Sequence, residues 1–420
     1  MPTIFFTIAL ILICITVRNA VREFGTLFNP WFFFLCIEVG VLHVVSIVSG
    51  SLLDLYEDER SYAYLLCGSA VYITGYAVAY YVRSMALQSV IFSTFKLIPN
   101  ISINRSTVIA VILGLVGALA LLVVVGQAGT LWFTDPRLAY LSYRGATGDG
   151  ALFVLAQWML MLSTAVSIFA VDSKPARVFI TLTAYCAVAY FYGSKQVLLN
   201  LIIFAVFVLD YQGYKVKLAH LVIIGAMCAL IFIAMLGSGG DGGQLANTAL
   251  YFSEYGVNTA KIFSPEVTKS FFTGEIFISN LWTFLPRFMF SEKPYEYGQV
   301  LINSVLFPGA AEQGQTPGLL YWSSWYVDFC FLGVLLFGFL RGTFDCVVYA
   351  TLRHNRGNVL RVLLAFSLSI TPIFLYAPQI YQFIFILIVS TAFRSIAQLV
   401  RPRTRDSFRS MSALKNTSES

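Results

Sequence analysis

The sequence predicts an all-α protein that crosses a membrane about eleven times. Its composition is 58% hydrophobic and only 11% charged, and its mean hydropathy is +0.77. A soluble domain of 420 residues with this composition would expose apolar surface and aggregate. Long apolar runs recur along the chain, and basic residues are concentrated in alternate connections between them. Lipid is therefore expected to surround most of the chain.

The apolar runs divide the chain into four regions. Eight predicted helices occupy residues 1–236, a long connection occupies 237–318, three more helices occupy 319–393, and a basic, serine-rich tail at 394–420 is expected to be disordered. The first run has no basic residues before it and no small-residue cleavage site, so we expect a retained helix rather than a signal peptide. The runs lie near residues 2–17, 30–49, 62–82, 107–126, 151–171, 178–192, 197–211, 218–236, 319–340, 360–376 and 378–393.

The distribution of basic residues predicts the orientation of the spans. With the N-terminus on the extracytoplasmic side, most of the 27 lysines and arginines fall in inward connections or in the C-terminal tail, as the positive-inside rule requires. The last inward connection is expected to begin at Arg341. The net charge of +6 is therefore explained by topology and by a tail near anionic lipid, and no nucleic acid is expected as a partner.

Three outward connections depart from a plain helical bundle, at residues 127–150, 193–196 and 237–318. The third contains aromatic residues, prolines and apolar runs at ordinary density, so it is expected to fold as a small helical cap. None of the seven cysteines lies in the connection 237–318. Neither a disulfide framework nor a Cys/His metal site is therefore predicted.

The hairpin at 193–196 joins two short predicted helices. Residues 178–192 and 197–211 would each form about 22 Å of helix, whereas the hydrocarbon core is about 30 Å thick. Lys195 would then be recessed in the outer leaflet, where a cation is by default a candidate for function. Local thinning of the bilayer, or a lysine that extends to the interface, accounts for the same pattern without function.

One face of a predicted helix in the long connection is polar and aromatic. Tyr251, Glu254, Tyr255 and Asn258 follow i, i+3, i+4, i+7 spacing, and Asn247 is the expected N-cap. Aromatic rings stack on the C–H faces of sugars, while a carboxylate and an amide take sugar hydroxyls. The face therefore suits a sugar, and the solvated side of a surface helix is the alternative.

Several outward cations lie near membrane junctions, where a lipid head group would sit. Arg287 follows Pro286 and Lys293 precedes Pro294, so the chain is stiff at both positions. A rigid arginine at an interface suits bidentate phosphate binding, and head-group anchoring without catalysis is the alternative. The four junction cations are Arg137, Arg144, Lys195 and Arg287.

The titratable residues inside apolar runs include Glu38, His43 and Asp328. Glu38 and Asp328 require partners, because an isolated carboxylate in lipid is costly. Each is expected either to line the cavity or to hydrogen-bond between helices. His43 lies within the second predicted helix and is expected to be a packed, hydrogen-bonded residue rather than a catalyst.

The segment Leu285-Pro-Arg-Phe-Met-Phe-Ser-Glu-Lys-Pro-Tyr-Glu-Tyr-Gly298 resembles the I-P-R-x-x-W-P-D-K-P-x-x-x-G segment of Wzy-type O-antigen polymerases. Tyr251-Phe-Ser-Glu-Tyr-Gly-Val-Asn258 is similar to their Y-S-D-Y-x-x-N stretch. Gly193-Ser-Lys195 lies where those proteins carry a Gly-Asn-Lys or Gly-Ser-Arg hairpin.

Further pieces agree in order. Thr316-Pro-Gly318 and Trp325 to Gly333 resemble a family passage that enters a membrane helix, and Asp135-Pro-Arg137 with Tyr143-Arg-Gly145 is similar to the first outward loop. The resemblance covers about residues 130–335 by motif and the rest by topology.

This resemblance implies a glycosyltransferase of GT-C-like membrane architecture that needs no metal ion or other cofactor. Its substrates would be oligosaccharide repeat units linked to undecaprenyl diphosphate, at the periplasmic face of the bacterial inner membrane. The growing chain would move from its lipid diphosphate to the sugar end of a newly flipped unit. Membrane lipids would surround the protein, whose N-terminus would be periplasmic and C-terminus cytoplasmic, and a chain-length regulator is a candidate partner.

The resemblance also implies roles for individual residues. Cations would clamp the diphosphate and stabilise the charge that develops as it leaves. An outward carboxylate would take the proton of the acceptor hydroxyl, with Glu254 first, then Glu275 and Asp328. The clamp would consist of Arg144, Lys195 and Arg287, with Arg137 and Lys293 as second choices, and sugar contacts would come from Tyr251, Tyr255, Asn258 and Tyr326.

Two alternative functions stay open. An O-antigen ligase would share the outward arginines but would be expected to carry an outward catalytic histidine, and residues 237–318 contain none. A flippase or other transporter of lipid-linked oligosaccharide would be expected to have two repeat halves with interrupted helices at the membrane midplane.

Overall fold

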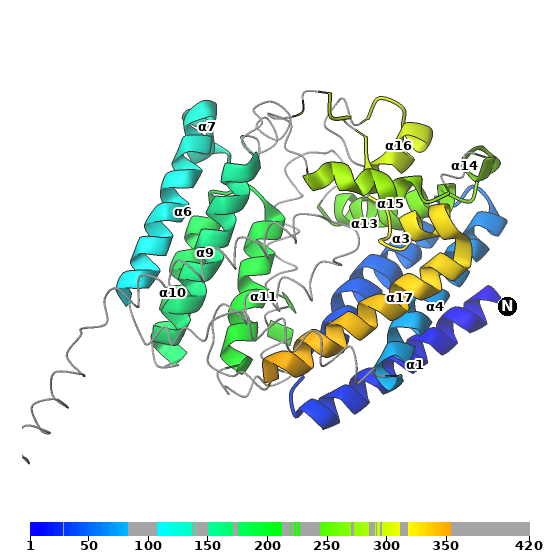
Figure 1. Ribbon diagram of the computed structural model, residues 1–420, viewed down its shortest axis with the longest axis horizontal. Helices are drawn as coiled ribbons and strands as arrows, with labels where there is room; N and C mark the ends of the chain where they lie inside the picture. The colour runs from blue at the N-terminus through cyan, green and yellow to red at the C-terminus, as the bar shows by residue number, and fades with distance from the viewer. Residues whose placement is uncertain are drawn as a thin grey trace, which may run out of the picture.

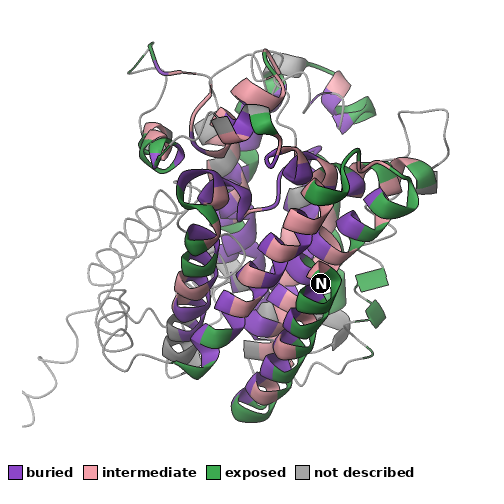
Figure 2. Cartoon of the chain, turned by 90° about the vertical axis from the view of Figure 1, so that its right-hand side faces the viewer, coloured by how far each residue is buried: buried purple, intermediate pink, exposed green. Residues whose placement is uncertain are grey.

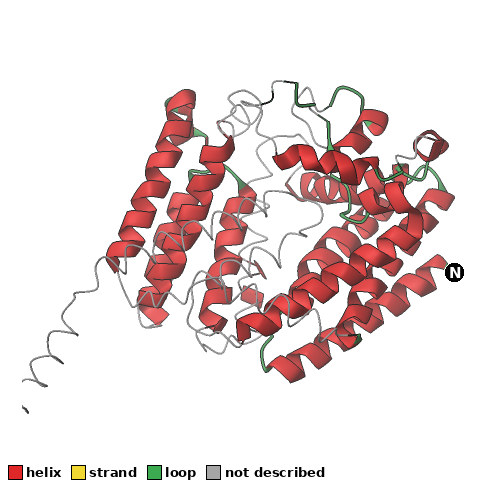
Figure 3. Ribbon diagram, viewed as in Figure 1, coloured by secondary structure: helices red, strands yellow, loops and turns green. Residues whose placement is uncertain are grey.

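In the computed structural model, the described residues form helices and no strand (Figure 3). The described helices meet at apolar faces, and these faces form the core of the bundle. The described parts of the chain are residues 1–27, 29–82, 107–136, 139, 150–170, 175–211, 219, 222–223, 225–226, 244–269, 273–284, 290, 292–294, 296–310 and 318–353.

Four helices are long and apolar enough to cross a membrane within the described residues. They confirm the predicted runs near 2–17, 30–49, 62–82 and 319–340, although each helix extends beyond its run. The first is α1 (Pro2–Phe24), the third is α4 (Glu59–Tyr81), and the fourth lies in α17 (Ser323–Arg353). The second is continuous from Pro30 to Leu52 and consists of α2 (Pro30–Phe33), the π-helix η1 (Phe34–Val45) and α3 (Ser46–Leu52).

Four further apolar helices coincide with predicted runs. They are α6 (Thr107–Ala128), α9 (Gly150–Ala170), α10 (Pro175–Tyr190) and α11 (Lys195–Tyr211). At 1.5 Å per residue, α10 and α11 are about 24 and 26 Å long, so the hairpin between them joins two short helices, as predicted. The runs predicted at 360–376 and 378–393, and nearly all of 218–236, lie outside the described residues. The total of eleven spans therefore stays a prediction.

The helices pack in two groups (Figure 1). One group contains α1, the Pro30–Leu52 helix, α4 and α17, and the other contains α6, α9, α10 and α11. A hydrogen bond of 2.7 Å from the hydroxyl of Thr26 to the carboxylate of Asp210 joins the two groups beyond the end of α1 and near the end of α11.

The outer face of α1 is apolar. Phe6, Ala9 and Ile13 are buried against the bundle, whereas Ile4 and Ile8 on the opposite side are more than half exposed. Figure 2 shows the same pattern in the surrounding helices, with exposed residues on the outside and buried residues where helices meet. An exposed row of isoleucines is expected on a helix that faces lipid, and this pattern supports a membrane-spanning bundle.

Helices α4 and α17 approach each other closely because glycines line their contact. A side-chain carbon added at Gly75 would lie 2.5 Å from the carbonyl oxygen of Leu335, and one added at Gly338 would lie 2.4 Å from that of Tyr72. Gly338 and Gly342 are four residues apart on α17, the spacing that brings membrane helices together. These glycines place the polar groups of α17 within reach of α4.

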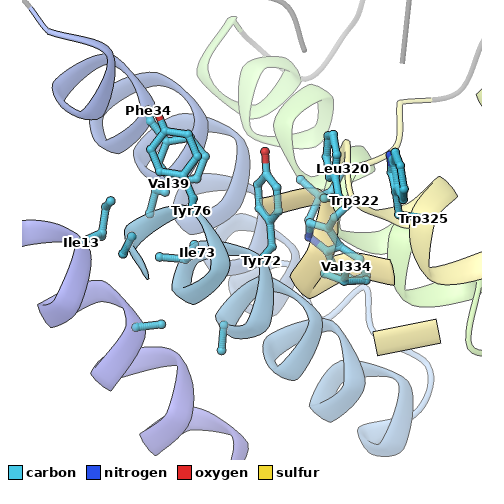
Figure 4. Close-up of a cluster of buried hydrophobic side chains, with 14 of the residues drawn as sticks. Ile13, Phe34, Val39, Tyr72, Ile73, Tyr76, Leu320, Trp322, Trp325 and Val334 are labelled. Atoms are coloured by element: carbon cyan, nitrogen blue, oxygen red, sulfur yellow. The ribbon is translucent and has the colours of Figure 1, made fainter. Parts of the chain in front are cut away.

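Aromatic side chains fill the centre of this bundle. The ring of Phe34 stacks on that of Tyr76 with 3.6 Å between centroids, and Tyr72 stacks on Phe337 at 5.4 Å. Figure 4 shows Phe34 over Tyr76 on one side of Tyr72, and Trp322 with Val334 on the other. The core therefore runs without interruption from the N-terminal spans to α17.

The described helices of the connection 237–318, which we call the cap, lie at one end of the bundle (Figure 1). The first of them, α13, packs against α3, η1 and α4. It begins at Gln244, so the expected N-cap at Asn247 is wrong and that residue lies in the first turn. The described helices are α13 (Gln244–Lys261), α14 (Pro265–Lys269), α15 (Glu275–Ser279), η2 (Asn280–Phe284), η3 (Gly298–Val300) and α16 (Leu301–Leu306).

Helix α17 corrects one further expectation. The last inward connection was expected to begin at Arg341, but the helix continues to Arg353 and buries the Arg341 side chain. The helix is also interrupted near its start, because Phe329 and Cys330 have non-helical backbone angles and Cys330 has a φ of 55°. The expected orientation of the spans therefore rests on the remaining basic residues.

Candidate functional site

The predicted diphosphate clamp lies largely outside the described residues. This holds for Arg137, Arg144 and Arg287, and for the side chain of Lys195, whose backbone begins α11. The clamp therefore stays a prediction.

Two aromatic residues just before the 193–196 hairpin contact neighbouring helices. The hydroxyl of Tyr192 donates to the carbonyl oxygen of Ala156 in α9 at 2.9 Å. The ring of Phe191 lies 6.4 Å from that of Phe133 in α7 (Leu131–Thr134), which follows α6. Phe133 of the connection 127–150 therefore lies beside the residue that leads into the 193–196 hairpin.

The predicted polar and aromatic face lies on α13. The hydroxyls of Tyr251 and Tyr255 are 3.4 Å apart, and the amide of Asn258 donates to the carbonyl oxygen of Gly318 at 3.2 Å. The ring of Tyr255 also packs on Gly318, where an added side-chain carbon would lie 2.8 Å away. The structure therefore uses part of this face to hold the segment that leads into α17.

Glu254 is the exposed carboxylate of the same face. Partial burial of this carboxyl raises its pKa above the ordinary value by desolvation. A general base works best when its pKa is close to the operating pH, so this shift favours proton transfer. Of the three predicted base candidates, Glu254 combines exposure with a raised pKa.

Asp328 joins α17 to the cap. One carboxylate oxygen accepts from the backbone N–H groups of Gly274 and Ile276 at 3.1 and 3.2 Å, and the other accepts from Phe277 at 2.8 Å. These are the unpaired donors at the start of α15, so Asp328 caps that helix from another element. The neighbouring candidate Glu275 is exposed at the first position of α15. These three N–H groups are the hydrogen-bond partners that a carboxylate in an apolar run requires.

Lys293 lies within the cap rather than on its surface. Its side chain is buried, and its ammonium group lies 4.6 Å from the centre of the Tyr297 ring. This cation–π contact fixes the position of the charge. In the described part of the Pro-Arg to Lys-Pro segment, Lys293 is therefore the buried residue, whereas Phe290 and Glu292 are exposed.

Tyr326 lines a cavity of about 540 Å³ between the cap and the bundle. Its walls come from the connection before α4, the first turns of α4, the end of α13, α14 and the start of α17. Its volume falls within the range of about 300–1,000 Å³ that is typical of ligand sites. None of the four predicted residues on α13 lines it; instead α13 contributes Val257, Ala260 and Lys261.

A buried ionic network lies deeper in the bundle and includes residues that the sequence did not single out. Arg341 of α17 forms a salt bridge with Glu38 of η1, and both side chains are nearly inaccessible. The hydroxyl of Tyr72 donates to Glu38 at 2.6 Å and accepts from Arg341, and that of Tyr76 donates to Asp345 at 2.6 Å. Glu38 thus has the partners expected of an intramembrane carboxylate.

His43 belongs to the surroundings of this network. It is fully buried, its Nδ1 lies 2.8 Å from the carbonyl oxygen of Glu38, and its ring stacks on that of Tyr72 at 5.8 Å. The expectation of a packed, hydrogen-bonded histidine is therefore confirmed. Apolar residues resume after Arg341 at Phe344, and this is the local sign in the sequence that the helix continues past this arginine.

Comparison with curated proteins connects this architecture to a known activity. The chain is 28% identical over 204 residues to an O-antigen polymerase of Salmonella typhimurium strain LT2, and equally to one of Salmonella typhi. This chain is similar to O-antigen polymerases. The match covers 47% of this chain and 48% of each relative, so the chain spans about half the length of the curated relatives it matches. No protein-family model and no solved structure matches the chain. The resemblance inferred from the motifs is confirmed.

Proposed function

We propose that this protein is an O-antigen polymerase, a glycosyltransferase that joins oligosaccharide repeat units linked to undecaprenyl diphosphate. The similarity to two O-antigen polymerases carries the proposal. A bundle with at least four membrane-length helices and a folded cap supports it, because the substrate has a membrane-embedded diphosphate and a glycan outside the lipid. The reaction would take place at the periplasmic face of the inner membrane, with GT-C-like architecture and no metal ion.

The proposed reaction breaks one bond and forms another at the same sugar carbon. The anomeric carbon of the donor chain loses its bond to the phosphate oxygen, and undecaprenyl diphosphate leaves with that electron pair. The acceptor hydroxyl bonds to this carbon, and Glu254 takes its proton. Arg144, Lys195 and Arg287 would stabilise the leaving diphosphate, with Arg137 and Lys293 nearby. Preorganised charge of this kind is usually the largest contribution to catalysis.

The direct test incubates the purified protein with lipid-linked repeat units. Longer chains on the lipid are expected. Transfer to lipid A-core would indicate a ligase instead, and unchanged material would favour a transporter. Either result would overturn the proposal.

Two substitutions test the residue roles in cells. Arg287→Ala is expected to leave the protein inserted but to reduce the O-antigen ladder to a single repeat unit, whereas Lys269→Ala, a cap cation without an assigned role, should preserve the ladder. A normal ladder from Arg287→Ala would show that Arg287 is not part of the diphosphate clamp.

Glu254→Gln is expected to abolish polymerisation. A wild-type rate of this variant on purified lipid-linked units would exclude Glu254 as the base.

A further inference from the structure

The cavity that Tyr326 lines has an aromatic wall. The ring of Tyr326 lies 4.7 Å from that of Phe263 and 5.0 Å from that of Phe331, and Tyr64 of α4 lies 5.3 Å from Phe263. All four side chains line the cavity. These rings hold one another in place across α4, the α13–α14 connection and α17, so the wall is formed before any ligand enters.

Hydroxyl and charged groups surround this wall. Ser61, Ser264 and Thr268 contribute hydroxyls, and the cavity is also lined by Glu57, Asp58, Arg60 and Lys261. The guanidinium of Arg60 donates to the Tyr64 hydroxyl at 3.3 Å, which places a donor at the edge of the aromatic wall. Donors and acceptors around an apolar surface are what a sugar ring requires, since its hydroxyls take both.

The charges of the cavity do not favour a phosphate group. Two acidic and two basic residues line it, so no excess of positive charge is available to the ligand. Hydrogen bonds from the backbone N–H of Arg60 and from the hydroxyl and N–H of Ser61 lower the pKa of Asp58, which therefore stays ionised. A diphosphate would meet this carboxylate at close range.

The cavity also lies in line with the proposed base. Lys261 follows Glu254 by seven residues on α13, two turns further along nearly the same side and about 10 Å away by the rise of the helix. An oligosaccharide bound in the cavity would therefore extend along α13 toward Glu254. The group that must reach the base is a hydroxyl of the acceptor.

We propose that the cavity formed by Tyr64, Phe263, Tyr326 and Phe331, with Arg60 and Lys261 at its edge, binds sugars of the acceptor repeat unit. This inference rests on the proposed polymerase function, which supplies a reason for an acceptor. The wall would stack on one face of a sugar ring, and the flanking groups would select its hydroxyl pattern.

Binding is tested on the full-length protein in nanodiscs by calorimetric titration with the repeat-unit oligosaccharide released from the lipopolysaccharide of the source strain. Tyr64→Ala removes part of the wall and is expected to weaken binding about tenfold, the loss of one aromatic contact. Thr268→Trp fills the cavity without removing the wall and should abolish binding, even if Tyr64→Ala folds poorly. Tyr81→Ala, at the opposite end of α4 and outside the cavity, is the control and should bind as wild type.

The role in accepting chains is tested with two lipid-linked substrates. A donor whose non-reducing acceptor hydroxyl is methylated can give its chain but cannot receive one. An acceptor joined to its lipid diphosphate by a C-glycosidic bond can receive a chain but cannot give one, so the KM of each substrate is measured separately. Thr268→Trp should raise the KM of the acceptor about tenfold or more and leave the KM of the donor unchanged.

Several results would overturn the inference. They are unchanged oligosaccharide binding in both cavity variants, a rise in the donor KM alone, or displacement of the oligosaccharide by inorganic pyrophosphate. Failure of the wild-type protein to extend lipid-linked chains would instead refute the polymerase function, and the titration would still report whether the cavity binds sugar.

Discussion

Replacing Arg341 by Met is expected to destabilise the protein by about 3 kcal/mol, because it removes one partner of a buried ion pair. Both side chains of the pair are only about 5% exposed. Breaking a buried pair by removing one partner typically costs about 3–5 kcal/mol, since the remaining charge has no compensation. Glu38 would keep its hydrogen bond from Tyr72 at 2.6 Å, which offsets part of the loss and places the cost at the lower end of that range.

The assay is reversible unfolding of the full-length protein in mixed micelles with increasing dodecyl sulfate. Arg341→Met, Glu38→Gln and the double variant are compared with wild type. The double variant is expected within about 1 kcal/mol of wild type, because removing both charges removes the uncompensated one as well. Additive losses in the double variant, or an unchanged midpoint for Arg341→Met, would show that the two residues do not stabilise each other.

Three further predictions concern the cap, the helix contact and the base. Asp328→Ala leaves three N–H groups at the start of α15 without an acceptor. Hydrogen exchange across residues 274–279 should therefore accelerate, while the α4–α17 contact keeps its protection. Unchanged exchange at 274–279 would contradict the capping role of Asp328. Gly338→Val introduces a side chain against the carbonyl of Tyr72 and should lower the yield of folded protein severely, whereas Gly126→Val, which has open space around it, should not. Partial burial raises the pKa of Glu254. Because a base acts only when deprotonated, the polymerisation rate should be full above this raised pKa and should fall as the pH drops through it. A kcat/KM profile whose acidic limb lies at the ordinary glutamate pKa would argue against Glu254.

The sequence predicted the membrane helices well because their signal is local. Apolar runs at 30–49 and 62–82 differ from the observed helices by only a few residues at each end. The caps explain the observed boundaries: Asn29 accepts from the N–H of Phe32 at the start of α2, and Asp58 accepts from Arg60 and Ser61 at the start of α4.

The sequence does not predict the end of α17, because a charge such as Arg341 after an apolar run ordinarily indicates the end of a span. Arg341 lies inside the helix only because Glu38, far away in sequence, compensates its charge. No local pattern records that pairing. The contact follows from the packing of α17 on α4, whose glycines bring the backbones together.

The sequence predicts only part of the candidate site, because its contacts also join residues that are distant in sequence. Helical spacing correctly placed Tyr251, Glu254, Tyr255 and Asn258 on one face of α13, but spacing does not show that Asn258 holds Gly318. The cavity beside Tyr326 brings together α4, α13, α14 and α17, so it is a property of tertiary structure. Its polar residues look like ordinary loop residues in the sequence.

The Glu38–Arg341 pair has a consequence for synthesis of the protein. Glu38 emerges with the second span, whereas its partner is made far later, since 269 residues separate Arg341 even from Tyr72. At about 5–20 residues per second, ribosomes take roughly 13–54 s to cover that interval. During this time the first spans carry an unmatched carboxylate in the bilayer. Chains that terminate before Arg341 would keep the Glu38 carboxylate without its cationic partner.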